Sequence, residues 1–213
     1  KQIPACFHYR HLANHKSNSG DIFRMENIDF YKKFRIIMFI RDPFDRIVSE
    51  YNFVKSIGDE FFDNFNKKPL SLEEFIENPE THNSIINFLI GNKIYTDISS
   101  TVEQNTKDII ASISALNFLI CKTEEYNTSL NMLKEHFNFD TKIDVHRVGI
   151  HKDAIENYND LKLQFRKYNK FDYILYDFLL EKYEYEKRSL DLKRMTVYEF
   201  EGNAYKHIIK YVE

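Results

Sequence analysis

The most constraining feature of the sequence is an apolar run that leads directly into a charged turn. Phe34–Ile40 contains six apolar residues and one arginine, and Arg41, Asp42 and Pro43 follow it. Such a run is typical of a strand that is buried in a parallel sheet. Asp42 can cap a following helix, and Pro43 suits the first helical position, where a backbone N–H has no helical partner. The segment therefore predicts a strand, a turn and a helix.

The apolar residues after the turn follow helical spacing and extend the predicted helix to about Lys55. These residues are Phe44, Ile47, Val48, Tyr51 and Val54. Ligands of open α/β sheets bind beyond the carboxyl ends of the strands, where the turn places Arg41. Ser49 follows Asp42 by about two helical turns and shares its face. A guanidinium and a hydroxyl directed at one crevice suit a phosphate, although an ordinary strand–helix turn with a surface ion pair would also fit.

The rest of the chain alternates strand-like and helical segments. A second apolar run, Asn117–Cys121, predicts another strand, and Ile3–Tyr9 is a candidate for a first one. Capping residues and helical spacing predict helices at Ser71–Phe75, Ser84–Leu89, Thr101–Ala115, Thr123–Phe137 and Asp160–Leu190. Alternation of this kind is the signature of an α/β layered fold.

Two expectations follow for the way these segments pack. Phe34–Ile40 and Phe118–Cys121 should be parallel strands of one sheet, with Arg41 and Lys122 at the same edge. Apolar stripes on two helices should face the core. The stripes are Val102, Ile109, Ile110 and Ile113 on one helix, and Phe165, Tyr168, Phe171, Ile174, Leu175, Phe178 and Leu179 on the other.

Composition fits one domain and excludes some functions. The chain has 213 residues, of which 43% are hydrophobic, so it can bury a substantial core. Its net charge of −3 argues against a general nucleic-acid binder. No apolar run approaches the ~20 residues of a membrane span, and no signal peptide is visible. Cys6 and Cys121 both lie in apolar runs, which favours a buried reduced pair over a disulfide framework.

The segment after the first strand resembles the 3′-phosphate-binding segment of sulfotransferases that use 3′-phosphoadenosine 5′-phosphosulfate (PAPS). The matching residues are Arg41, Asp42, Pro43, Arg46, Ser49 and Tyr51. The likeness is strongest to carbohydrate sulfotransferases, especially the hexuronic-acid 2-O-sulfotransferases, and to their bacterial relatives. It implies that Arg41 and Ser49 hold the 3′-phosphate. Phe118–Glu125 with Ser129 and Leu130 resembles a second block of the family, and Tyr173–Phe178 resembles its closing helix.

This resemblance implies a P-loop-like three-layer fold in which helices flank a central parallel sheet. It extends from Phe7 to about Tyr185 and predicts an N-terminally incomplete domain at 1–192, with 193–213 as an extension of unknown role. It also implies transfer of a sulfuryl group from PAPS to a hydroxyl of a saccharide or glycoconjugate, without a metal and without a nucleic-acid partner. The expected location is the cytoplasm, or the Golgi lumen if the chain is eukaryotic.

One departure from the family bears on activity. Sulfotransferases bind the 5′-phosphosulfate in a loop of the form Pro-Lys-x-Gly/Ala-x-Thr/Ser, through backbone N–H groups and a lysine. The nearest lookalike, His15–Gly20, lies much closer to Arg41 than the family's loop does. We therefore expect the first strand–loop–helix unit to be missing, so that this sequence transfers sulfate poorly or not at all. A non-catalytic nucleotide- or glycan-binding module is the alternative. A small-molecule kinase fits badly, because the Walker glycine loop and an acidic metal-binding motif are missing.

Histidines supply the candidate general base, because the attacking hydroxyl must lose a proton as sulfur is attacked. In the 2-O-sulfotransferases that base is a histidine at the end of the strand before the Arg-Asp-Pro strand. His11 matches it best, with His8 as the alternate. Three histidines within eight residues, counting His15, also permit a zinc site or a set of surface histidines.

A basic cluster around Arg147 and Lys152 occupies a loop after the helix predicted at Thr123–Phe137. In the family, the corresponding loop covers the nucleotide with basic side chains and backbone donors. The resemblance therefore assigns Arg147 and Lys152 to nucleotide binding, and the alternative is an ordinary solvated loop.

Overall fold

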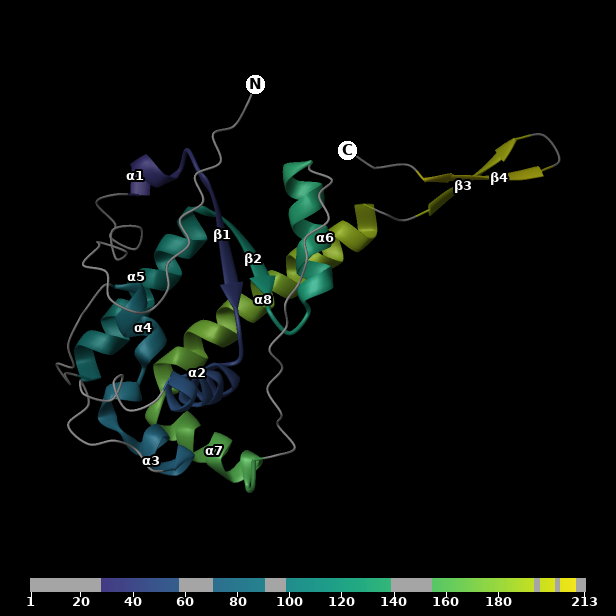
Figure 1. The fold of residues 1–213 in the computed structure, drawn as a ribbon. Coiled ribbons are helices and arrows are strands. Elements are labelled where there is room, and N and C mark those ends of the chain that lie inside the picture. Colours follow the sequence, from purple (N-terminus) through teal and green to yellow (C-terminus); the bar gives the residue numbers. More distant parts are fainter. Residues whose placement is uncertain are drawn as a thin grey trace.

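The computed structural model describes residues 28–57, 71–90, 99–138, 155–193, 196–201 and 204–209 (Figure 1). The helices are α1 (Ile28–Tyr31), α2 (Pro43–Ile57), α3 (Leu72–Glu77), α4 (Ser84–Leu89), α5 (Ser99–Ala115), α6 (Tyr126–Phe137), α7 (Tyr158–Tyr168) and α8 (Lys170–Lys193). The strands are β1 (Arg35–Ile40), β2 (Asn117–Lys122), β3 (Thr196–Glu201) and β4 (Ala204–Ile209). A 3₁₀ turn spans Pro79–Thr81. Most of the described residues are thus helical, and none of these helices is long and apolar enough to cross a membrane.

The two predicted strands form a parallel pair, which confirms the central expectation of the sequence. β1 and β2 run in register, with Ile40 opposite Lys122. Arg41 follows Ile40 directly, so Arg41 and Lys122 lie at the same carboxyl edge, as predicted. We call this region, where both strands end, the carboxyl edge.

The start of α2 also matches the prediction. The carboxylate Oδ1 of Asp42 accepts hydrogen bonds from the backbone N–H groups of Phe44 (3.0 Å) and Asp45 (3.1 Å). Pro43 is the first helical residue. The start of α3 is capped in the same way, because the Ser71 hydroxyl accepts a hydrogen bond from the backbone N–H of Glu74 at 3.1 Å. Local capping thus set both helix starts.

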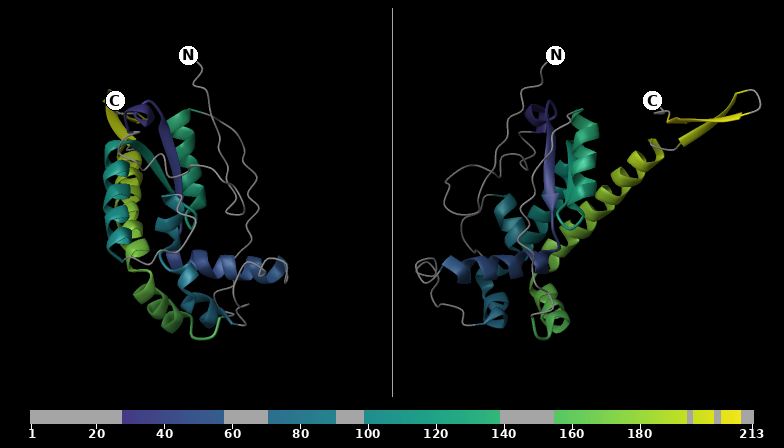
Figure 2. Two further views of the ribbon diagram at one scale, coloured as in Figure 1. Left: turned by 90° about the vertical axis from the view of Figure 1, so that its left-hand side faces the viewer. Right: turned by 45° about the vertical axis from the view of Figure 1, so that its right-hand side comes forward.

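Helices pack on both faces of the small sheet. Figure 2 shows α5 and α8 on one side of the strands and α6 on the other. Residues of β1 and β2 form one core cluster with α4, α5, α6 and α8, in which Ile109 and Ile113 are fully buried, as predicted. The described residues therefore form a mixed, α/β-like arrangement in which a two-stranded parallel sheet packs against helices.

A second core cluster lies beyond the carboxyl edge and joins α2, α3 and α7. Its centre is the buried face of α2, formed by Phe44, Ile47, Val48 and Tyr51, as the helical spacing predicted. Phe75 and Ile76 of α3, Phe165 of α7 and Tyr173 of α8 complete the cluster. This second core fixes α2 relative to the sheet.

The predicted segment Asp160–Leu190 is helical, but it forms two helices and not one continuous helix. α7 ends at Tyr168 and α8 begins at Lys170, with the buried Asn169 between them. The Asn169 side chain donates to the Phe165 carbonyl (3.0 Å) and accepts from the N–H of Asn83 (2.6 Å). An asparagine amide that bonds to backbone groups competes with the helical pattern.

The break at Asn169 also changes which residues face the core. Phe165, Leu175 and Leu179 of the predicted stripe are buried, but Tyr168 and Ile174 are exposed. Asp172 and Tyr173 are buried instead. A smaller correction concerns α6, which begins at Tyr126 rather than Thr123. Thr123 instead bonds to β1, since its N–H and hydroxyl both donate to the Ile40 carbonyl, at 3.0 and 3.1 Å.

The C-terminal extension contains an antiparallel pair of strands. β3 pairs with β4, with Thr196 opposite Ile209. Figure 1 shows this hairpin projecting beyond the end of α8. The candidate first strand, Ile3–Tyr9, lies outside the described residues.

Candidate functional site

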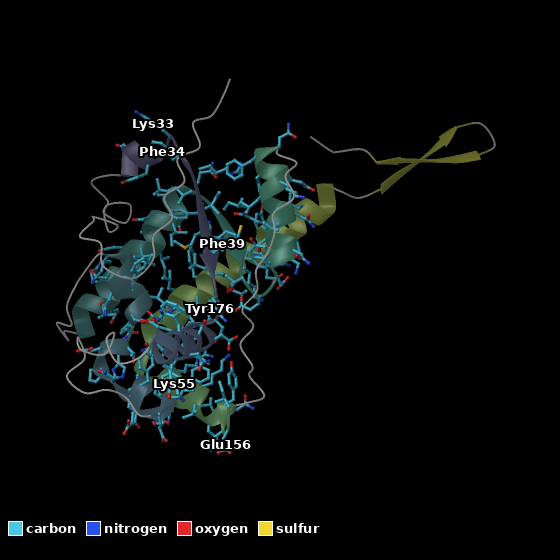
Figure 3. The ribbon with its side chains drawn as sticks, in the orientation of Figure 1. Lys33, Phe34, Phe39, Lys55, Glu156 and Tyr176 are labelled. Carbon is cyan, nitrogen blue, oxygen red and sulfur yellow. The ribbon has the colours of Figure 1, made fainter. Side chains whose placement is uncertain are left out.

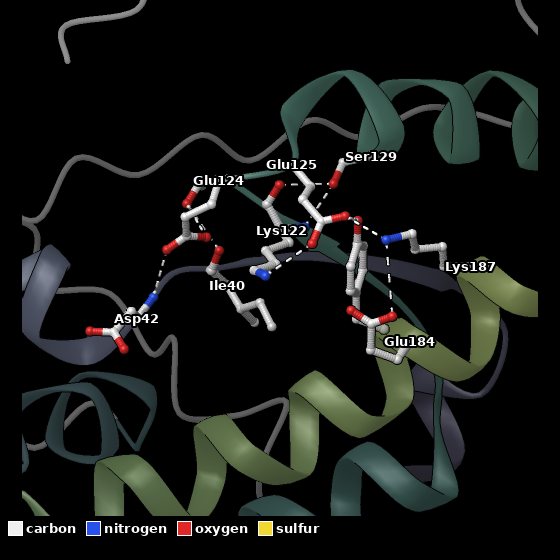
Figure 4. A network of polar contacts seen from close by, with 10 residues as sticks. Ile40, Asp42, Lys122, Glu124, Glu125, Ser129, Glu184 and Lys187 are labelled. Atoms are coloured by element: carbon white, nitrogen blue, oxygen red, sulfur yellow. Dashed lines mark hydrogen bonds and ion pairs between the residues drawn. The ribbon is translucent and has the colours of Figure 1, made fainter. Parts of the chain in front are cut away.

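Hydrogen bonds between the segments that follow β1 and β2 tie the carboxyl edge together (Figure 4). Besides the two bonds from Thr123 to the Ile40 carbonyl, the backbone N–H of Asp42 donates to Glu124 Oε1 at 2.9 Å. The Ser129 hydroxyl of α6 bonds to both the N–H and the carbonyl of Lys122, at 2.8 and 2.9 Å. These contacts hold the turn that carries Arg41 in a fixed position.

Three lysines at the carboxyl edge are already paired with carboxylates. Lys162 Nζ lies 2.8 Å from Asp42 Oδ2. Lys122 and Lys187 both bind Glu125, at 3.0 and 2.6 Å. The hydrogen bond from Lys187 is the main cause that holds the pKa of Glu125 down at about 2, and Lys122 adds to it. Glu184 also lies 4.0 Å from Lys187, so three carboxylates face the three lysine charges.

Arg41 differs from these lysines. Its side chain is half-buried and makes no hydrogen bond or ion pair with any described residue. A half-buried guanidinium has five N–H donors, and its fork matches the oxygens of a carboxylate or a phosphate. Within the described part of the carboxyl edge, Arg41 is thus a cation that can receive an anionic ligand.

The N-terminus of α2 is less available to an anion than a helix start usually is. The Asp42 carboxylate already accepts from the Phe44 and Asp45 N–H groups, and its other oxygen binds Lys162. An anion would have to displace a negative charge that is built into the chain. A phosphate at this edge must therefore be bound by side chains, chiefly by that of Arg41.

Ser49 lies two turns into α2, on the same side of the helix as Asp42. Seven residues separate Ser49 from Asp42, which corresponds to ~10 Å along the helix axis. Its hydroxyl is half-buried and forms no hydrogen bond with a described residue, Arg41 included. Arg46, which lies between them, is bound to Glu50 at 2.6 Å and to the Ser84 hydroxyl. Arg41 and Ser49 thus both lack a partner among the described residues, and the structure does not bring them together.

The other predicted site residues fall outside the described part of the chain. These are His8, His11, Arg147 and Lys152. Their roles as general base and nucleotide-binding residues stay predictions. Of the two cysteines, Cys121 is described: it is buried and not in a disulfide, and burial raises the pKa of its thiol to about 12. Cys6 lies outside the described residues.

The sequence analysis gave several residues of this region no role at the carboxyl edge. The Tyr158 hydroxyl donates to the buried Asp45 carboxylate. Burial raises the pKa of the Tyr173 and Tyr176 phenols, and the nearby Asp42 charge raises both further. Figure 3 shows Tyr176 near the level at which β1 leads into α2. These tyrosines come from α7 and α8, more than 100 positions from Asp42, so local patterns could not place them.

Comparison of the chain with models of protein families, with curated proteins and with solved structures finds no match.

Proposed function

We propose that the chain binds a nucleotide with a 3′-phosphate at the carboxyl edge, and that it is a PAPS-dependent sulfotransferase of the P-loop-like three-layer type. The observation that carries this proposal is the unpaired Arg41 at the carboxyl end of a parallel strand pair, among described residues. Ligands of parallel sheets bind beyond this edge. Each of the three neighbouring lysines has a carboxylate partner, which leaves Arg41 as the residue suited to an added anion.

Arg41 can take an added phosphate because the carboxylate next to it in the chain is already engaged. Two oxygens of a phosphate dianion can accept two parallel N–H hydrogen bonds from the guanidinium group. Asp42 adjoins Arg41 but is committed to the α2 cap and to Lys162. Ser49 can add a hydroxyl donor if the long Arg41 side chain holds the phosphate alongside α2.

The proposed reaction is an in-line displacement at sulfur. The acceptor hydroxyl oxygen of a saccharide or glycoconjugate forms a bond to sulfur, while the bond from sulfur to the 5′-phosphate oxygen breaks. The hydroxyl proton goes to a neutral imidazole, His11 or, as the alternate, His8. The products are the sulfate ester and adenosine 3′,5′-bisphosphate.

A second candidate function is nucleotide or glycan binding without transfer. The observation that favours it is the charge balance of the described part of the carboxyl edge, where Arg41 is unpaired and the lysines are paired. One unpaired guanidinium can hold one phosphate, whereas sulfuryl transfer also requires stabilisation of the leaving 5′-phosphate. The two candidates share nucleotide binding and differ in turnover.

Calorimetric titration with adenosine 3′,5′-bisphosphate tests the shared step. Arg41→Ala should weaken binding by about 2 kcal/mol or more, because a charge-assisted bidentate contact is lost. Binding of 5′-AMP, which has no 3′-phosphate, should hardly change. Lys55→Ala is a matched control, because Lys55 is an exposed cation at the other end of α2. Equal losses for both nucleotides, or no binding by the unaltered chain, would refute the assignment.

A turnover assay with PAPS and a saccharide acceptor then separates catalysis from binding. In a form of the protein that turns over, His11→Ala should lower the rate by roughly 10²-fold or more while nucleotide affinity stays unchanged. His8→Ala is the internal control. Loss of turnover in His8→Ala alone would assign the base to His8. Nucleotide binding without any turnover would support the binding module.

A further inference from the structure

We propose that Phe39 and Tyr126 form an aromatic platform that stacks on the purine base of the nucleotide whose phosphate Arg41 holds. This inference rests on the proposed nucleotide binding and adds a base subsite to it. The two rings stack at the boundary of β1 and α6, with centroids 6.2 Å apart and planes inclined by 27°. Figure 3 labels Phe39 on β1.

The exposure of Phe39 is unusual for its place in the fold. It lies opposite Cys121 in the parallel register, and Cys121 is fully buried on the face that α6 covers. Phe39 is nevertheless 44% exposed. Among the described elements, α6 thus covers the β2 half of this sheet face and does not reach across the β1 half. Tyr126, the first residue of α6, supports the Phe39 ring from one side.

The spacing between the platform and the cation suits a nucleotide. Phe39 precedes Arg41 by two residues, which spans ~7 Å of extended chain. The ribose of a nucleotide separates its base from its 3′-phosphate by a comparable length. With the Arg41 side chain lying back along β1, a phosphate on its guanidinium would leave the base within reach of the exposed part of Phe39. Aromatic side chains are common stacking surfaces for bases.

The other end of β1 provides a natural control. Phe34 is 43% exposed and also lies against an aromatic ring, that of Tyr31, at 6.3 Å. It precedes the first residue of β1 and so lies at the end opposite the carboxyl edge. Phe34 and Phe39 have similar exposure, and each has an aromatic neighbour. Of the two, however, only Phe39 lies near Arg41, two residues before it.

The absence of tryptophan from the sequence makes a direct test possible. Phe39→Trp and Phe34→Trp each introduce a single tryptophan, whose fluorescence can be excited apart from that of the 14 tyrosines. Adenosine 3′,5′-bisphosphate should quench the fluorescence of Phe39→Trp and leave that of Phe34→Trp unchanged. A base-free ribose bisphosphate should quench neither. In calorimetry, Phe39→Leu should weaken nucleotide binding by ~10-fold without affecting the base-free compound, and Phe39→Tyr should retain affinity.

The outcomes separate this inference from the proposed function. Nucleotide binding that depends on Arg41 but is unchanged in Phe39→Leu overturns the platform and leaves the phosphate site standing. Equal weakening of the nucleotide and the base-free compound in Phe39→Leu also overturns it, since Phe39 would then act through the position of Arg41. No nucleotide binding by the unaltered chain overturns both.

Discussion

Two carboxylates in different regions of the molecule have pKa values that are shifted in opposite directions. At the carboxyl edge, Glu125 is partly exposed and binds two lysines, and these contacts lower its pKa to about 2. Where α4 meets α8, Asp172 is buried, and its partners among the described residues are two backbone N–H groups, those of Ile85 (3.1 Å) and Ile86 (3.0 Å). Burial raises the pKa of Asp172 to about 6, against the opposing effects of these N–H groups and of Arg46.

The difference separates structural polar groups from those that can serve a ligand. The buried network is closed: Asp172 caps α4, while the Asn83 side chain accepts from the N–H of Phe171 (3.0 Å) and so caps α8. The carboxyl edge is open, because its lysines are paired but Arg41 has no partner among described residues. A buried network whose polar groups are all paired stabilises the fold. A network with an unpaired group at a sheet edge can bind a ligand.

The largest expected effect comes from opening the closed network. Asp172→Ala should lower the free energy of unfolding by about 3 kcal/mol, because two N–H groups at the start of α4, those of Ile85 and Ile86, lose their acceptor. Urea unfolding monitored by circular dichroism measures this. Asp177→Ala, on an exposed part of the same helix, should change stability by less than about 0.5 kcal/mol. Equal losses in both variants would show that the buried network is not special.

The pH dependence of stability should differ in sign between the two regions. The pKa of Asp172 is raised on folding. Its contribution to the free energy of unfolding is therefore fully present below about pH 4 and is lost as the pH rises through about 6. The unfolding free energy of the unaltered chain, relative to Asp172→Asn, should therefore fall by on the order of 2 kcal/mol between pH 4 and 7. A relative increase over this range would contradict the assignment.

An intermediate effect is expected at the cap of α2, which has the chemistry of Asp172 at a less buried place. Asp42→Ala should lower the free energy of unfolding by about 1 kcal/mol, the usual loss for an N-cap. Asp42→Asn keeps a capping oxygen and should lose less. Thermal or urea unfolding of the two variants checks this order. A loss in Asp42→Ala as large as that in Asp172→Ala would show that burial does not set the difference.

The smallest effect should come from the ion pairs of the carboxyl edge. Glu125→Gln should cost about 0.5 kcal/mol at neutral pH and low salt, and less at high salt, because its pairs are partly exposed. The pKa of Glu125 is lowered on folding, so its contribution is present above about pH 4.5 and is lost as the pH falls toward 2. Urea unfolding of both proteins at low and at high salt measures this contribution to stability. Glu184→Gln, whose pair with Lys187 is 4.0 Å long, should change less.

Much of the local structure was predictable from the sequence because its causes lie close together in the chain. The Asp42 and Ser71 caps each bond within three residues, and the predicted α4 matches Ser84–Leu89. The parallel pairing of β1 and β2 followed from two apolar runs separated by helices. The exposed side of Phe39 was not predictable, because it depends on how far α6 extends over the sheet.

Neighbouring residues specify the two strands, the capped start of α2 and the position of Arg41 at the end of β1, so these features can be read from the sequence. The break at Asn169 depends instead on long-range packing, because its side chain bonds to Asn83, 86 positions away. Packing also brings Lys162 to Asp42 across 120 positions and leaves Arg41 without a partner among described residues. Pairing between distant charges depends on packing, and periodicity and caps carry no information about it.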